Sequence, residues 1–116
     1  DGETRVVMRF HPTLAPVTVA VLPLSKKLRD DVAPIERMLR RHWNVEVDFS
    51  GNIGRRYRRQ DEIGTPYCVT YDFESAGDGK VTVRFRDSMA QERVPIDGLV
   101  CFLRDRIKRE DAEGAR

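Results

Sequence analysis

The chain has 116 residues, of which 40% are hydrophobic and 34% charged, and its formal net charge is +2. This length suits one domain with a single hydrophobic core. The near balance of charge excludes a strongly basic whole chain, so any nucleic-acid site must come from local clusters. Cys68 and Cys101 are too few for a disulfide scaffold, and both are expected to be buried thiols.

No membrane or targeting segment is expected. The apolar run at residues 19–22, even extended to Leu24, is far too short to span a bilayer. The first residues are acidic and polar, unlike a signal peptide, and we expect a cytoplasmic protein. Because the sequence does not begin with methionine, we expect a piece of a longer chain. Prolines follow His11 and Ala15, and residues 1–16 are interpreted as a linker into the domain.

Residues 17–24 are almost wholly apolar, which predicts a strand buried on both faces, as in a parallel sheet. The next apolar residues recur every three or four positions and predict one face of a helix. Pro34 cannot donate a hydrogen bond inside that helix, so we expect it in a first turn capped by Asp30 or Asp31, with a broken or kinked start near Asp30. The apolar positions of this helix are Leu28, Val32, Ile35, Leu39 and Trp43.

Alternation and β-branched or aromatic residues predict four further strands. A second helix at 53–63 is expected to follow the turn 50–52 and to end at Gly64. Pro95 places the last strand at an edge of the sheet. Asp97 is expected to cap a final helix. The four strands are predicted at residues 44–49, 67–73, 80–86 and 91–96, with a turn at 76–79 between the second and third of them. The buried stripe of the last helix is predicted at Leu99, Leu103 and Ile107.

The predicted order of elements is β-α-β-α-β-β-β-α. Strands separated by helices run parallel, with right-handed crossovers, whereas the turn at 76–79 makes the next strand antiparallel. The expected fold is α/β, with a mixed five-stranded sheet of three parallel strands plus antiparallel strands covered by three helices. The expected boundaries are a linker at 1–16, the domain at 17–109 and a frayed tail at 110–116.

Four arginines lie within five residues near the start of the second helix: Arg55, Arg56, Arg58 and Arg59. A helix N-terminus disfavours cations, so they do not serve the helix itself. One interpretation is a solvated charged face, with Arg58 neutralised by Asp61 and Glu62. The other is a contact with phosphate or RNA, and the residues alone leave both open.

A second group comprises Arg84, Arg86 and Asp87, which fit either an exposed salt-bridge ladder or the reading of a base edge. Phe73 ends the third strand and is either part of the core or a stacking platform for an unpaired base. Asp48 ends the second strand and is expected at the same edge of the sheet as Phe73, where ligands of such sheets bind.

Enzyme chemistry has little support in the sequence. His11 and His42 have no nucleophilic partner at a suitable spacing, and residues 51–54 lack the further glycine and lysine of a phosphate-binding loop. No metal-ligand spacing occurs. A small enzyme of unknown type is therefore the weakest hypothesis.

Residues 50–70, SGNIGRRYRRQDEIGTPYCVT, closely resemble the anticodon-binding domain of glycyl-tRNA synthetases. Residues 14–24 resemble the entry into that domain, and Asp72, Phe73 and residues 84–89 fit its later part. The resemblance covers about residues 5–105. It implies the class II synthetase anticodon-binding fold, with a five-stranded mixed sheet and three helices, in agreement with the pattern above.

The resemblance also implies recognition of the tRNA(Gly) anticodon, whose second and third bases are cytosines. It further implies a catalytic domain elsewhere in the same chain, which in a homodimeric parent enzyme uses ATP and magnesium to attach glycine to tRNA. This piece alone should lack that activity and needs no cofactor. The residues implied in base contacts are Arg55, Phe73 and Arg86, with Arg84 and Asp87 in support and Arg58 and Arg59 at backbone phosphates or neighbouring acids.

Three residues depart from the family pattern. Phe49 stands where an acid is usual, Asn52 where a serine is typical, and Phe85 where an aspartate is typical. Alternation places Phe85 on the core face, which indicates a packing variant. The alternative to a synthetase module is an interaction module, like the related accessory domain of the mitochondrial DNA polymerase processivity subunit. The run at 53–57 favours the synthetase.

Overall fold

The computed structural model describes residues 17–49, 51–86 and 88–114 of the chain, and the interpreted linker at 1–16 lies outside these residues. It contains one five-stranded sheet in the order β2-β1-β3-β4-β5. β1 pairs in parallel with β2 and β3, whereas β4 is antiparallel to both β3 and β5. The predicted mixed sheet is therefore confirmed. The strands are β1 (Val19–Pro23), β2 (Val45–Val47), β3 (Tyr67–Tyr71), β4 (Lys80–Phe85) and β5 (Gln91–Pro95).

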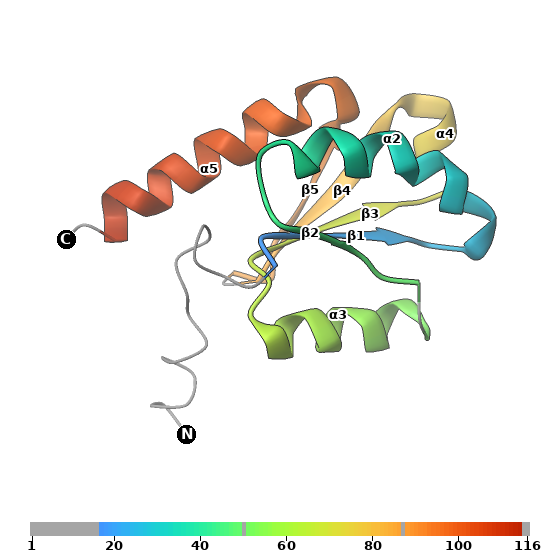
Figure 1. Cartoon of the computed structure of the whole chain (residues 1–116), viewed down its shortest axis with the longest axis horizontal. Helices are drawn as coiled ribbons and strands as arrows, with labels where there is room; N and C mark the ends of the chain where they lie inside the picture. Colours follow the sequence, from blue (N-terminus) through green and yellow to red (C-terminus); the bar gives the residue numbers. More distant parts are fainter. Residues whose placement is uncertain (1–16, 50, 87, 115–116) are drawn as a thin grey trace.

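The helices cover both faces of the sheet. In the described part of the chain, α2 and α5 lie on one face and α3 lies on the other (Figure 1). α5 continues to Gly114, through most of the segment that we expected to fray at 110–116. The three long helices are α2 (Arg29–Arg40), α3 (Ile53–Ile63) and α5 (Leu99–Gly114); the short ones are α4 (Ser75–Asp78) and the 3₁₀ turns η1 (Lys26–Leu28) and η2 (Ile96–Gly98).

The two faces of the sheet bury very different amounts of apolar surface. Between the sheet and the helices α2 and α5, seventeen buried residues of the described part of the chain form one cluster, which includes the predicted stripe Leu99, Leu103 and Ile107 of α5. On the α3 face the cluster has three buried residues, joined by Ile53 and Tyr57 of the helix; they are Ala20, Leu22 and Cys68. Hydrophobic burial therefore fixes α2 and α5, while α3 needs other contacts.

α3 begins and ends where the sequence predicts. The Asn52 side chain accepts a hydrogen bond from the backbone N–H of Arg55 at 2.8 Å, which satisfies a donor of the first turn. At the other end Gly64 has φ 82° and donates to the carbonyls of Asp61 and Gln60. This left-handed conformation favours glycine, which closes the helix.

The start of α2 differs from the prediction. Pro34 lies inside the helix instead of in its first turn, and the N-cap residue is Leu28, without a side-chain cap. Asp30 and Asp31 are themselves in the first turn, where their charges favourably meet the helix dipole. The expected break lies before them, where η1 forms a separate turn capped by Ser25.

Several predicted element ends are also corrected. Leu24 lies outside β1 and is 40% exposed, so residues 17–24 are not one buried strand. β2 and β3 are shorter than predicted, and Phe73 lies beyond the end of β3. Residues 75–78 form the short helix α4 instead of a plain turn. Asp97 lies within η2 and does not cap α5.

Gly64→Ala should destabilise the protein by roughly 1–2 kcal/mol, because alanine at a left-handed position brings Cβ too close to the backbone. Gly77→Ala is the matched control, since Gly77 lies in α4 with nothing within 4 Å of an added Cβ. It should stabilise by about 0.5–1 kcal/mol. Urea denaturation measures both, and equal effects of the two substitutions would contradict this account of the helix end.

Candidate nucleic-acid interface

The residues implicated by sequence divide between two opposite ends of the sheet. β1, β2 and β3 end at one edge, here called the carboxyl edge, where Arg55 lies in the first turn of α3 and Phe73 follows β3. Arg86 lies at the amino edge, where these strands begin, because its N–H donates to the carbonyl of Pro66 at 3.0 Å. α3 has 11 residues and is therefore about 16 Å long. It separates the two groups.

The carboxyl edge presents two exposed apolar side chains. Phe73 is 57% exposed, which shows that it is not a core residue, and Leu24 is 40% exposed. They follow adjacent strands, and the N–H of Leu24 donates to the carbonyl of Tyr71 at 2.8 Å. Arg55 is exposed at the same edge. No acid pairs with Arg55 among the residues that the structure describes.

The turn that carries Phe73 is held by ionic contacts. Asp72 accepts hydrogen bonds from Arg93 of β5 at 2.9 Å and from the N–H of Ser75 at 2.9 Å. Arg93 also reaches Asp78, at 3.0 Å. Desolvation alone would raise the pKa of Asp72, but its bonds to Arg93 and Ser75 hold that pKa below its usual value. The turn that carries the exposed Phe73 is therefore fixed by these hydrogen bonds.

Arg56 points inward, unlike its neighbour Arg55, and is only 4% exposed. Its Nη1 donates to the backbone carbonyls of Pro23 and Asp48, the latter at 3.0 Å, and its Nη2 donates to that of Leu24 at 3.4 Å. These carbonyls lie at the ends of β1 and β2. One guanidinium thus ties the first turn of α3 to the ends of two parallel strands.

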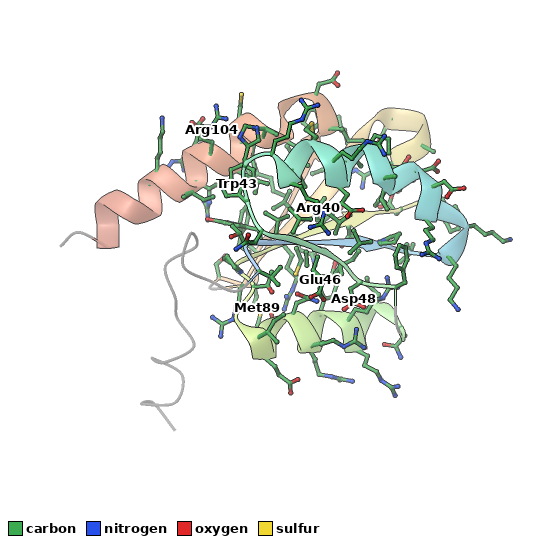
Figure 2. All side chains as sticks on the ribbon, viewed as in Figure 1. Arg40, Trp43, Glu46, Asp48, Met89 and Arg104 are labelled. Atoms are coloured by element: carbon green, nitrogen blue, oxygen red, sulfur yellow. The ribbon has the colours of Figure 1, made fainter. Side chains whose placement is uncertain are left out.

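Asp48 lies at the carboxyl edge as predicted, but its side chain is buried against α3. It is 5% exposed, and both of its carboxylate oxygens accept a hydrogen bond from Nη1 of Arg59. Gln60, also buried, donates to Asp48 at 3.1 Å and to Glu46 at 2.9 Å and accepts from Thr65 at 2.8 Å. Figure 2 shows Glu46 and Asp48 between the sheet and α3. Arg59 thus meets a neighbouring acid, one of its two predicted roles.

At the amino edge Asp61 holds two arginines. Its carboxylate accepts from both terminal nitrogens of Arg84, at 3.0 and 3.1 Å, and its backbone carbonyl accepts from Nε of Arg86 at 3.2 Å. The predicted pairing of Asp61 with Arg58 is therefore wrong. Arg58 itself is exposed, and no acid pairs with it in the described part of the chain.

Arg84 is fixed on three sides. Besides Asp61, its guanidinium lies 4.6 Å from the ring centre of Tyr57, and its Nη2 contacts Sδ of Met89. The hydrogen bonds that Arg84 donates to Asp61 raise the pKa of Arg84 above its ordinary value. Arg84 therefore forms a salt bridge with Asp61 of α3, and its side chain is only 11% exposed, unlike in the exposed ladder that was one of its two predicted roles. Asp87 lies outside the described residues.

The family model named "Anticodon binding domain" matches residues 18–106, which is most of the chain. The chain belongs to this family. The anticodon-binding domain is 60% identical over 107 residues to the glycine–tRNA ligase of Geobacillus kaustophilus, covering 92% of this chain and 23% of that protein. It is 61% identical over 102 residues to the same ligase of Acetivibrio thermocellus, covering 88% and 22%. The resemblance to glycyl-tRNA synthetases is thereby confirmed, and the chain spans less than a quarter of these relatives.

A solved structure agrees with the fold. The RNA binding domain of threonyl-tRNA synthetase from Cryptosporidium parvum matches with a TM-score of 0.78 and 28% identity, covering 86% of this chain and 26% of that one. Within the described residues, no helix is long and apolar enough to cross a membrane. Nor do three or more histidine, cysteine or acidic side chains in those residues gather as a metal site would require.

The three departures from the family pattern have structural roles in this anticodon-binding domain. Phe49 lies under the guanidinium of Arg29, at 4.8 Å from the ring centre. Asn52 caps α3, as a serine can. Phe85 is 6% exposed and packs edge-on against Tyr67, so its predicted place on the core face is confirmed.

The sequence pattern does not reveal the places of three residues in this site. Leu24 could have been found, because Pro23 before it favours the end of a strand. Arg56 is indistinguishable by sequence from the exposed arginines beside it. Met89 is 58% exposed with φ 60°, and no sequence signal predicts that conformation for methionine.

The two cysteines of the anticodon-binding domain differ. Cys68 is buried and Cys101 is exposed, so the prediction of two buried thiols is wrong for Cys101. Burial raises the pKa of Cys68 to about 12, although the positive charge of Arg84 acts in the opposite direction. Reaction with a disulfide reagent at pH 8 should therefore modify Cys101 but not Cys68, because only a thiolate reacts. Unfolded protein should react at both, and two rapid reactions in the native state would contradict this assignment.

Arg56→Ala should destabilise the domain by roughly 2–4 kcal/mol, because it removes charged hydrogen bonds and leaves buried carbonyls without a donor. Arg55→Ala is the matched control, an adjacent and exposed arginine in the same helical turn. It should change the free energy of unfolding by less than about 0.5 kcal/mol. Urea denaturation of both variants measures the difference. A similar stability for the two would show that the contacts of Arg56 do not hold α3.

Proposed function

We propose that this domain recognises the anticodon of tRNA(Gly) within a glycine–tRNA ligase. The observation that carries the proposal is the identity of about 60% with glycine–tRNA ligases over nine-tenths of the chain. In the intact enzyme, a catalytic domain in the rest of the chain would attach glycine to tRNA with ATP and magnesium. That enzyme would be a cytoplasmic homodimer.

The exposed side chains suit an unpaired RNA loop. An unstacked cytosine offers O2 and N3 as acceptors, which arginine can donate to, and its ring face can stack on an aromatic. Phe73 supplies the aromatic at the carboxyl edge, with Arg55 at the same edge. Arg86 supplies a guanidinium at the amino edge, where its Nε is already held by Asp61.

The outward face of α3 would connect the two edges. Arg55 and Arg58 are three positions apart on this helix and both are exposed, so they lie on neighbouring parts of its surface. Arg58 would contact phosphates between bases bound at either end. Arg84 and Arg59 would stabilise this surface without contacting the RNA directly, because each forms an ion pair with an acid of the protein. The anticodon loop would then lie along α3 with its bases spread toward both edges, and Asp87, the next residue in the sequence after Arg86, would assist in base recognition.

Binding of anticodon stem-loop RNAs tests the proposal. Fluorescence anisotropy with a labelled tRNA(Gly) stem-loop should give a Kd that rises with salt, because phosphate contacts release counterions. Replacing each anticodon cytosine by uridine should weaken binding by about 1–3 kcal/mol, the usual value of a base-edge contact. Equal affinity for both RNAs would contradict recognition of the anticodon.

Phe73→Ala and Arg86→Ala separate the two edges. Loss of the aromatic ring should weaken binding of every loop by about 1–3 kcal/mol, since stacking is tolerant of sequence. Loss of Arg86 should reduce discrimination against the uridine loop by roughly 1–3 kcal/mol. The matched control is Arg37→Ala, an exposed arginine of α2 on the opposite face of the sheet, which should leave both affinities unchanged. An equal loss in all three variants would indicate charge or folding effects instead of a defined surface.

A further inference from the structure

Met89 has a backbone conformation that a methionine rarely adopts. Its φ is 60°, and no other non-glycine residue in the described part of the chain has a positive φ. Glycine and asparagine are the usual residues at such positions, because a bulky side chain brings Cβ too close to the backbone. The hairpin between β4 and β5 would therefore be more stable with a different residue here.

Hydrogen bonds of the hairpin enforce this conformation. The N–H of Met89 donates to the carbonyl of Phe85 at 2.8 Å, and the N–H of Phe85 donates to the carbonyl of Ala90 at 2.9 Å. Ala90 in turn donates to the side chain of Ser88 at 3.2 Å. None of these bonds needs the methionine side chain. Its presence therefore calls for a reason outside the turn.

The side chain is exposed yet held in place. Met89 is 58% exposed, and Sδ contacts Nη2 of Arg84, whose guanidinium is fixed by Asp61 and the ring of Tyr57. Figure 2 shows Met89 at the amino edge, beside one end of α3. An exposed methionine thus lies at a defined position next to Arg84, and Asp61 links Arg84 to Arg86.

This combination suits the face of an unstacked nucleobase. A thioether is polarizable and packs favourably against aromatic rings, and the nucleobase is such a ring. The guanidiniums of Arg84 and Arg86, which share the single acid Asp61, favour a negatively charged strand over a cationic partner. A protein partner would be expected to need a wider apolar patch than this single side chain.

We propose that Met89 packs against the face of one unstacked base of the RNA loop that this domain binds. The inference rests on the proposed function and adds a contact at the amino edge. The thioether covers a ring face, whereas Arg86 reads a base edge. Because every base has such a face, Met89 contributes affinity and little discrimination between bases.

Substitution with glycine separates binding from folding. Met89→Gly relieves the backbone strain, so its urea midpoint should equal or exceed that of the wild type. Its affinity for the tRNA(Gly) stem-loop should nevertheless fall by about two- to tenfold, the range expected for a contact between a thioether and an aromatic ring. The loss should be the same for the cytosine and uridine loops, unlike the loss in Arg86→Ala.

Two further variants of the full 116-residue chain complete the test. Met89→Leu keeps an apolar side chain and should bind within about twofold of the wild type. Met89→Asn tolerates the left-handed backbone but is polar, so it should lose affinity as the glycine variant does. The asparagine variant also provides a test if glycine makes the hairpin more flexible.

The outcomes distinguish this inference from the proposed function. Wild-type affinity in both Met89→Gly and Met89→Asn would overturn the contact, and so would an equal loss in Met89→Leu. A loss confined to the cytosine loop would also overturn it, since a face contact does not select the base. Failure of the wild-type chain to prefer the cytosine loop would instead contradict the proposed function.

Discussion

α3 is held on the sheet chiefly by buried hydrogen bonds of its own polar side chains. Only three buried residues of the sheet form an apolar cluster beneath it, far fewer than lie under α2 and α5. Arg56 compensates by donating to carbonyls at the ends of β1 and β2, and the contacts of Asp48 with Arg59 and Gln60 extend this network along the helix. The position of every arginine on the surface of α3 depends on these inward contacts.

The contacts that hold α3 divide the arginines of this region into two classes. Arg56 and Arg59 form hydrogen bonds or ion pairs within the protein, as does Arg84 of β4, whereas Arg55 and Arg58 remain exposed. A charged helix of this kind is therefore neither a purely solvated face nor a uniform phosphate-binding patch. Its inward arginines fix the helix, and the outward ones are available to an RNA loop. This division reconciles a net charge of only +2 with a local basic surface.

The sequence alone predicts most of the fold, because helix-capping residues and the alternation of apolar residues act on neighbouring positions in the chain. Asn52 and Gly64 mark both ends of α3, and alternation identifies β4 and the core position of Phe85. The partners of the arginines could not be predicted in this way. Arg84 and Asp61 are 23 positions apart and meet only because the sheet and α3 pack together. The division of the site between two edges likewise depends on strand direction and not on any residue pattern.

NMR chemical-shift mapping during titration with the tRNA(Gly) anticodon stem-loop would locate the bound RNA on the domain. The largest changes are expected at both edges of the sheet and on the outward face of α3, at Arg55, Arg58, Phe73, Arg86 and Met89. Residues of α2 and α5, on the opposite face (Figure 1), should remain unaffected. Changes concentrated on α2 and α5 would contradict this interpretation, because the RNA would then bind the face of the sheet opposite α3 and its arginines.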